Sequence, residues 1–239
     1  LGAGNVSDVY TVSTLSTTAS NPLDLVLKDI ASNSAVLNWS APSDFGGVSL
    51  TDYKVETSRD GMTWAVMTKS VSLTRSLKLT GLAPGTTYQV RISAINSVGA
   101  SDPLSGSVTT LAVVPTVPRS LKVTGKSLST ATLAWSLPAS DGGSAITDYK
   151  VEVSSNCSTF TTISRAASKN LGFKVTGLKA GTKYCFRVSA KNSVGFSDAS
   201  SELTVVTDGN APNAPTSLAV KASTTSVTLS WKAATVTDG

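Results

Sequence analysis

Tryptophan recurs at a fixed interval in this chain, because Trp39, Trp135 and Trp231 are separated by 135 − 39 = 96 and 231 − 135 = 96 residues. Other residues repeat at the same interval, and the pairs are Tyr53/Tyr149, Leu82/Leu178, Tyr88/Tyr184, Asn96/Asn192 and Gly99/Gly195. A period of about 100 residues is the length of a complete small domain, well above the roughly 20–50 residues of a solenoid repeat. The sequence therefore predicts a series of similar domains, each of which buries its own core.

Within each interval, apolar and polar residues alternate in the pattern of half-buried β-strands. Residues 51–56 recur unchanged as residues 147–152. In the first copy Tyr53 and Val55 are expected to face a core, and the intervening polar side chains are expected to face water: Asp52, Lys54 and Glu56. Glycine-containing turns separate such runs. About seven short strands in each repeat, with a turn every 8–12 residues or so, predict antiparallel β-sandwiches.

The repeated residues together resemble the fibronectin type III family. The resemblance rests on tryptophan in the second strand, tyrosine in the third, and a Gly-Leu-x-x-Gly-Thr-x-Tyr segment at residues 81–88 and 177–184. Asn-Ser-Val-Gly turns that begin at Asn96 and Asn192 complete the set. The combination covers the whole chain and implies an all-β fold: tandem immunoglobulin-like, seven-stranded β-sandwiches in an elongated array.

The same resemblance implies that the repeated aromatic and leucine side chains maintain the cores and bind no ligand. These core residues are Trp39, Tyr53, Leu82 and Tyr88, with Trp135, Tyr149, Leu178 and Tyr184 in the second repeat. The Gly-Gly-x-x-x-Thr-Asp-Tyr form of residues 46–53 and 142–149 is most similar to members of the family in secreted bacterial proteins.

The resemblance also implies a domain layout. The expected parts, in chain order, are the C-terminal strand of a preceding domain (1–20), a complete domain (21–112), a linker (113–117), a second complete domain (118–208), a second linker (209–214) and the N-terminal strands of a further domain (215–239). Both linkers are expected to be semi-rigid, because proline in and beside them favours an extended backbone. A less favoured alternative is that the terminal pieces complete sandwiches in neighbouring molecules by strand donation.

The net charge of +5 does not indicate nucleic-acid binding. Residues 21–117 carry seven basic and seven acidic side chains, whereas residues 118–214 carry eleven and six, a net charge of +5. A nucleic-acid-binding array is expected to present a basic face on every domain. We therefore expect no nucleic-acid partner, and we expect no membrane insertion because no apolar stretch approaches the 18 or so residues of a membrane helix.

The residues of common catalytic and metal centres are missing. The chain has no histidine, which excludes Ser-His-Asp and Cys-His arrangements, and two cysteines cannot build a structural zinc site alone. The candidate carboxylate pairs lie about 13 Å apart along a strand, beyond glycosidase separations, and we interpret them as a solvated strand face: Asp52/Glu56 and Asp148/Glu152. We expect a non-enzymatic chain with no cofactor and no small-molecule substrate.

The two cysteines both fall in the second repeat. Cys157 is in the turn after the third strand, and Cys185 is near the start of the sixth strand, on its outward face. The first repeat has Gly61 and Gln89 at these positions. Since the two strands are antiparallel neighbours in the sandwich, we predict a Cys157–Cys185 disulfide, with two free thiols as the alternative. A disulfide implies an oxidising, extracellular setting.

Lys183, Arg187 and Lys191 form a basic stripe on the outward face of the sixth strand of the second repeat. The stripe could dock an anionic glycan or another anionic partner. We favour a solubilising role, because no exposed aromatic residues are expected to interleave with these charges.

The leading hypothesis is a structural or adhesive segment of a secreted or cell-surface protein, acting as an extended spacer and interaction scaffold. A filament or other surface assembly is one setting in which such a segment would serve. Its partners are expected to be a protein or glycan surface, or other copies that associate through exposed edge strands. The alternatives are a spacer or carbohydrate-binding appendage of an extracellular polysaccharide hydrolase, and decoration domains of a phage tail or virion. The sequence discriminates poorly among these, since one scaffold serves them all.

Overall fold

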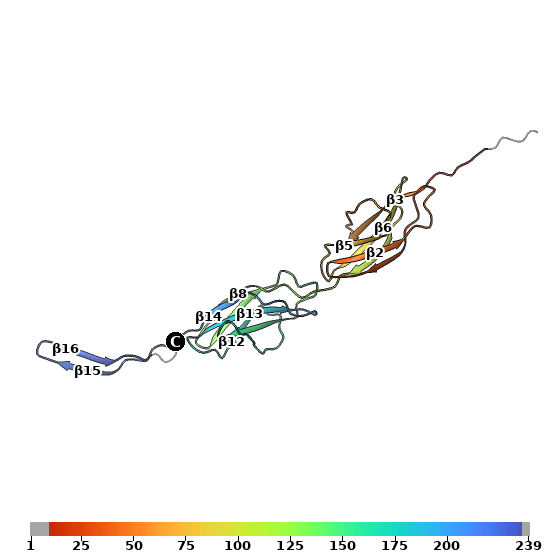
Figure 1. The fold of residues 1–239 in the computed structure, drawn as a ribbon. Helices are drawn as coiled ribbons and strands as arrows, with labels where there is room; N and C mark the ends of the chain where they lie inside the picture. The colour runs from red at the N-terminus through yellow and green to blue at the C-terminus, as the bar shows by residue number, and fades with distance from the viewer. Residues whose placement is uncertain (1–9, 236–239) are drawn as a thin grey trace, which may run out of the picture. The chain divides into compact units, whose positions relative to one another are not determined.

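The computed structural model describes residues 10–235, and within them every regular element is a β-strand. The chain divides into two compact units at the Ala112–Val113 boundary. The predicted all-β class and the tandem sandwiches are thereby confirmed (Figure 1). No helix in this part of the chain could cross a membrane.

The first domain contains seven strands in two sheets (Figure 1). One sheet has the order β1-β2-β5 and the other has the order β4-β3-β6-β7, and all pairings are antiparallel. The strands are β1 (Leu23–Lys28), β2 (Ser34–Ser40), β3 (Leu50–Ser58), β4 (Ala65–Val66), β5 (Ser76–Thr80), β6 (Thr87–Asn96) and β7 (Leu104–Thr109).

The second domain repeats this topology strand for strand. Its sheets have the orders β8-β9-β12 and β11-β10-β13-β14. Even the register is kept, because Tyr53 opposes Ala94 in the first domain and Tyr149 opposes Ala190 in the second. The strands are β8 (Arg119–Lys126), β9 (Thr130–Ser136), β10 (Asp148–Ser154), β11 (Thr161–Thr162), β12 (Gly172–Thr176), β13 (Lys183–Lys191) and β14 (Leu203–Val206).

Each domain has a core between its two sheets, built around a tryptophan and a tyrosine. The ring centroids of Trp39 and Tyr53 lie 5.4 Å apart, and those of Trp135 and Tyr149 lie 5.4 Å apart. These four residues are buried, as are Leu82 and Tyr88, while Leu178 and Tyr184 are partly buried and pack against the second core. The eight residues expected to form the cores thus lie in or against them.

The tyrosine of the sixth strand also fixes the turn before it. The hydroxyl of Tyr88 accepts a hydrogen bond of 2.9 Å from the Ala83 N–H, and the hydroxyl of Tyr184 accepts one of 3.0 Å from the Lys179 N–H. This is the tyrosine corner of immunoglobulin-like sandwiches. It explains why the Gly-Leu-x-x-Gly-Thr-x-Tyr segment repeats as a unit.

The segment that precedes the first domain is tied to it by an asparagine. The side-chain amide of Asn96 donates to the carbonyl oxygens of Thr17 at 2.8 Å and Phe45 at 3.0 Å. Gly46 lies against the same backbone with a φ of 72°, and a Cβ there would collide with the Thr17 carbonyl oxygen. Glycine is therefore required at this position for both its conformation and its size.

The second domain holds its preceding segment in the same way. Asn192 donates to the carbonyl oxygens of Val113 at 2.7 Å and Asp141 at 2.8 Å, and the Val113 N–H donates to Gly142 at 2.9 Å. Residues 113–117, expected to be a linker, therefore include backbone that is hydrogen-bonded to the second domain.

The two ends of the described chain differ from the complete domains. Residues 10–22 contain no strand, although a strand is expected in residues 1–20, and residues 1–9 lie outside the described part. At the other end, β15 (Thr216–Ala222) and β16 (Val227–Lys232) form a two-stranded hairpin whose apolar side chains are exposed, Trp231 included. Residues 236–239, the end of the expected partial domain, also lie outside the described part.

Candidate functional site

The outward face of the four-stranded sheet carries a side-chain cluster in the first domain. Glu56 on β3 is only 6% exposed. Its carboxylate accepts a hydrogen bond from Arg91 Nε on β6 at 2.7 Å, and Lys54 Nζ lies 3.3 Å away. The guanidinium carbon of Arg91 lies 4.1 Å from the ring centroid of Trp64, which immediately precedes β4. We call these four residues the first outer cluster.

The second domain has an equivalent second outer cluster, made of Lys150, Glu152, Arg187 and Phe160. Arg187 Nε and Nη2 donate to the two carboxylate oxygens of Glu152 at 3.0 and 3.3 Å, and Lys150 Nζ lies 3.4 Å from Oε2. The guanidinium carbon of Arg187 lies 4.1 Å from the centroid of Phe160. Two domains therefore build the same arrangement of carboxylate, guanidinium and aromatic ring.

These clusters correct two expectations from the sequence. The face that carries Glu56 and Glu152 is not freely solvated, because each carboxylate is buried and paired with an arginine whose guanidinium lies over an aromatic ring. Aromatic residues also do lie among the basic side chains. The sequence does contain a sign of these rings: Trp64 and Phe160 are 160 − 64 = 96 residues apart, so both repeats have an aromatic residue at the same position.

The electrostatics of the clusters follow from these contacts. The hydrogen bond from Arg91 lowers the pKa of Glu56, and it outweighs the opposite effect of burial. The same contact raises the pKa of Arg91. Burial raises the pKa of Glu152, but the hydrogen bond from Arg187 and the charges of Lys150 and Arg187 outweigh it, so the net pKa is lowered. Both glutamates are thus ionised structural acceptors at neutral pH, and neither is poised as a general acid.

The other two candidate carboxylates are also engaged in structure. Asp52 pairs with Lys69 and accepts a hydrogen bond from the Ser72 N–H at 3.0 Å. Asp148 pairs with Arg165 at 2.9 Å and accepts from the Ser168 N–H at 2.9 Å. Each aspartate therefore fastens the third strand to the segment between the fourth and fifth strands. Each of the four carboxylates thus serves as an anchor within its own domain.

The structure separates the members of the predicted basic stripe. Arg187 is committed to Glu152, whereas Lys183 and Lys191 are exposed at the two ends of β13. Lys191 Nζ lies 5.1 Å from the ring centroid of Phe196, and Lys150 Nζ lies 5.3 Å from it. Phe196 is 40% exposed, so a ring and two ammonium groups meet at the end of the strand.

The two cysteines are joined in a disulfide in the structure, with their Cα atoms 5.2 Å apart. Cys185 is on the face of β13 opposite to the core, as expected, but it is 0% exposed because the bridge covers it and the Thr204 hydroxyl lies 3.4 Å from its sulfur. Glu202 is also near these sulfurs. A disulfide offers no thiolate to a metal ion, so this group makes no metal site in the oxidised protein.

Comparisons with known proteins agree with this geometry. A family model described as the fibronectin type III domain matches residues 20–110 and 116–206. Fibronectin type-III domain-containing protein 3A of Mus musculus is 31% identical over 222 residues, and Titin of Drosophila melanogaster is 29% identical over 223 residues. Each alignment covers 89% of this chain. Chitinase A1 of Niallia circulans is 38% identical over 149 residues, which is 59% of this chain.

The chain spans only a fraction of these relatives: 18% of the mouse protein, 1% of Titin and 20% of Chitinase A1. A solved structure, the crystal structure of chicken CNTN1 FN1-FN3 domains, has a similar fold with a TM-score of 0.57 at 19% identity, over 89% of this chain and 75% of that one. The family assignment rests on the two matches to the family model, on the shared topology of the two sandwiches and on the tyrosine corner in each. This chain belongs to the fibronectin type III family.

Proposed function

We propose that this chain is a non-enzymatic spacer and interaction scaffold within a secreted or cell-surface multi-repeat protein. The observation that carries the proposal is the self-sufficiency of each domain, which closes its own core and holds the segment before it through Asn96 or Asn192. Modules of this kind can be joined in series, because each is stabilised by its own contacts. The carboxylates anchor structure, and that use supports a role without catalysis.

The disulfide in the second domain supports a secreted or surface setting. Disulfides persist in oxidising compartments and are rare in the cytosol. We also propose a bacterial source, which the Gly-Gly-x-x-x-Thr-Asp-Tyr segments support through their resemblance to secreted bacterial members of the family. A filament or another repetitive surface assembly, held together in part through exposed edge strands, would use such modules as its repeating unit.

Peptide mapping of the native protein tests this proposal. Cells and medium are separated, free thiols are alkylated at once, and the protein is digested without reduction. We expect the protein in the medium or at the surface, with a linked peptide pair that contains Cys157 and Cys185 and no alkylated form of either. Recovery in the cytosol with both thiols alkylated would overturn the secreted setting.

The same digest separates the proposal from its rivals. Peptides from further repeats of about 96 residues on the flanks would support the spacer array. A flanking domain of different composition that hydrolyses polysaccharide would show that the chain is an appendage of a hydrolase. The similarity to Chitinase A1 supports this alternative. Copurification with phage tail or capsid proteins would favour a decoration domain.

A second candidate function is recognition of an anionic surface by the second domain. It is favoured by Lys183 and Lys191, whose ammonium groups are exposed, and by Phe196 beside Lys191. An aromatic ring beside a cation offers stacking together with charge, as acidic glycans and acidic protein surfaces require. The first domain carries Thr87 and Ile95 where the second carries these lysines, so it lacks the feature.

Retention on immobilised heparin measures this second function. The substitution Lys183→Thr copies the first domain at an exposed position and should lower the salt concentration needed for elution, since each lost contact removes electrostatic affinity. Lys221→Thr on the C-terminal hairpin removes one positive charge elsewhere and should change elution less. Equal shifts for the two variants would mean that net charge alone determines retention.

A further inference from the structure

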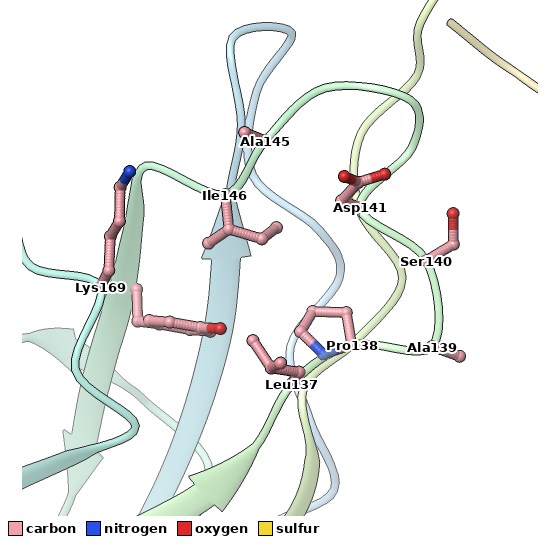
Figure 2. Close-up of a pocket in the computed structure, with 9 residues that line it drawn as sticks. Leu137, Pro138, Ala139, Ser140, Asp141, Ala145, Ile146 and Lys169 are labelled. Carbon is pink, nitrogen blue, oxygen red and sulfur yellow. The ribbon is translucent and has the colours of Figure 1, made fainter. Parts of the chain in front are cut away.

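An open pocket of about 600 Å³ lies on the second domain beside the core. Its walls come from the β9–β10 loop, and its lining includes Tyr149 of β10. Figure 2 shows Leu137, Pro138 and Ile146 facing one space, with Lys169 and Asp141 on opposite sides of it. The middle of the pocket is therefore apolar and its edges carry single charges of opposite sign.

A buried polar atom of one lining residue lacks a partner. Tyr149 is 1% exposed, and its hydroxyl has no hydrogen-bond partner among the residues that the structure describes. Buried hydroxyls are almost always hydrogen-bonded, because an unsatisfied one loses its interaction with water without compensation. Burial also raises the pKa of Tyr149, so the hydroxyl keeps its proton and can donate it to an acceptor. The hydroxyl is therefore an uncommitted hydrogen-bond donor beside the pocket.

The charges around the pocket favour one anionic group. Lys169 belongs to none of the ion pairs found between residues 10 and 235, so its ammonium group is uncommitted. The neighbouring charges are Asp141 at the opposite edge and the Arg165–Asp148 pair behind Tyr149, which is internally neutralised. A single negative charge beside Lys169 is favoured, whereas a second one near Asp141 would be repelled.

The first domain has a smaller pocket of about 360 Å³ at the equivalent place, which supports the assignment. Tyr53 corresponds to Tyr149, and Leu50 corresponds to Ile146. The cation of this pocket is Arg75, which belongs to none of the ion pairs in the described chain. Arg75 is not at the sequence position equivalent to Lys169, which is Leu73. Both pockets thus combine a tyrosine, an apolar wall and one uncommitted cation, and the cation comes from positions two residues apart.

We propose that the pocket over Tyr149 is a binding site for a small organic monoanion with an apolar ring, of the class of aromatic carboxylates. The ring fills the space between Leu137, Pro138 and Ile146, the carboxylate faces Lys169, and one carboxylate oxygen accepts a hydrogen bond from the Tyr149 hydroxyl. This inference concerns binding without turnover. It does not depend on the spacer function, since it rests on contacts within one domain.

The test is a titration of the full chain, labelled with ¹⁵N and with ¹³C in its tyrosine rings, followed by NMR. Benzoate is the probe, acetate is the control without a ring, and benzyl alcohol is the control without a charge. We expect saturable shifts at Tyr149 and Ile146 with benzoate in the millimolar range, and at least about tenfold weaker binding of each control. Shifts that do not saturate, or that acetate reproduces at equal concentrations, overturn the proposal.

Two variants assign the contacts. Lys169→Leu places the first domain's residue at an exposed position and should weaken benzoate binding in the second domain by about tenfold, with the shifts around Tyr53 as the unchanged internal reference. Tyr149→Phe removes only the hydroxyl and should weaken binding without loss of the folded spectrum. Unaltered benzoate affinity in Lys169→Leu contradicts the assignment, whatever the tyrosine variant does.

Discussion

The turn after the third strand is closed by different means in the two domains. In the first domain Gly61 takes the left-handed conformation with a φ of 73°, and in the second Cys157 takes it with a φ of 58°. Asp60 and Asn156 occupy the preceding position and accept the same pair of backbone N–H groups. The second domain thus gives up glycine at a position that favours it, and it gains a covalent link to β13.

The sandwich already brings the two cysteine positions together, whether or not cysteines are present. Ser58 opposes Gln89 across β3 and β6, and Ser154 opposes Cys185 across β10 and β13. The Cα separation of 5.2 Å in the second domain falls within the usual range for a disulfide, about 4.4–6.8 Å. The shared fold therefore permits a bridge in both domains, and only the second domain has the cysteines to form it.

The largest expected effects come from exchanging the bridge between the domains. The double variant Cys157→Gly and Cys185→Gln copies the first domain and should lower the unfolding free energy of the second domain by about 2–3 kcal/mol: about 3–4 kcal/mol for loss of the bridge on the chain-entropy account, less roughly 1 kcal/mol because glycine relieves the left-handed conformation of Cys157. Urea unfolding followed by the NMR signals of each domain measures it. Signals of the first domain should keep their midpoint, and an unchanged midpoint in the second would mean that the bridge contributes nothing.

The reverse exchange introduces the bridge into the first domain. Gly61→Cys with Gln89→Cys should form a disulfide in the first domain, because a Cβ at Gly61 would meet no atom within 4 Å. The expected gain is about 2–3 kcal/mol, since a side chain in the left-handed conformation costs roughly 1 kcal/mol. Urea unfolding of this variant is measured with and without dithiothreitol, so that the reduced form is the control for the oxidised one. Equal urea midpoints for the oxidised and reduced forms would show that a disulfide at this turn does not stabilise the first domain.

The smallest expected effect is a difference in acid sensitivity between the turns. Hydrogen bonds from the N–H groups of Thr63 and Met62, and from the Ser58 hydroxyl, hold the pKa of Asp60 well below its ordinary value of 3.8. Because the folded pKa is the lower one, this carboxylate stabilises the first domain above pH 3.8 and the contribution is lost as the pH falls below that value. Asn156 contributes no such term to the second domain.

Urea midpoints of both domains between neutral pH and strong acid check this difference. Asp60→Asn should remove part of the acid-induced loss from the first domain, and the pH profile of the second domain should not change. If the variant and the parent lose stability in parallel below pH 3.8, the turn carboxylate is not the source.

The strands and cores could be predicted from sequence because side-chain direction has a period of two in a strand. That rule put Tyr53 and Val55 in the core, where they lie. It does not say what covers the other face. Glu56 points outward as expected and is nevertheless buried, and it is paired with Arg91 of another strand, whose guanidinium lies over Trp64.

The pocket over Tyr149 was beyond sequence reasoning for a related reason. Tyrosine at this position is recognisable as a core residue from its repeat. The pocket that Tyr149 helps to line depends on how the β9–β10 loop and the segment of Lys169 are placed, and neither segment is periodic. Alternation constrains strands, whereas loop backbones depend on contacts between residues distant in the chain.

The asparagine that ties each domain to its preceding segment places the start of a self-contained structural unit before the first strand. Leu111 is hydrogen-bonded to Ala31 of the first domain, and Val113 is hydrogen-bonded to Gly142 of the second, which leaves only Ala112 between these two sets of bonds. A duplication or recombination breakpoint at Ala112 transfers each asparagine together with the backbone that it holds. A breakpoint at the first residue of β8 would separate them. A cassette that is to be moved between arrays should therefore start at Val113, several residues before the sandwich itself.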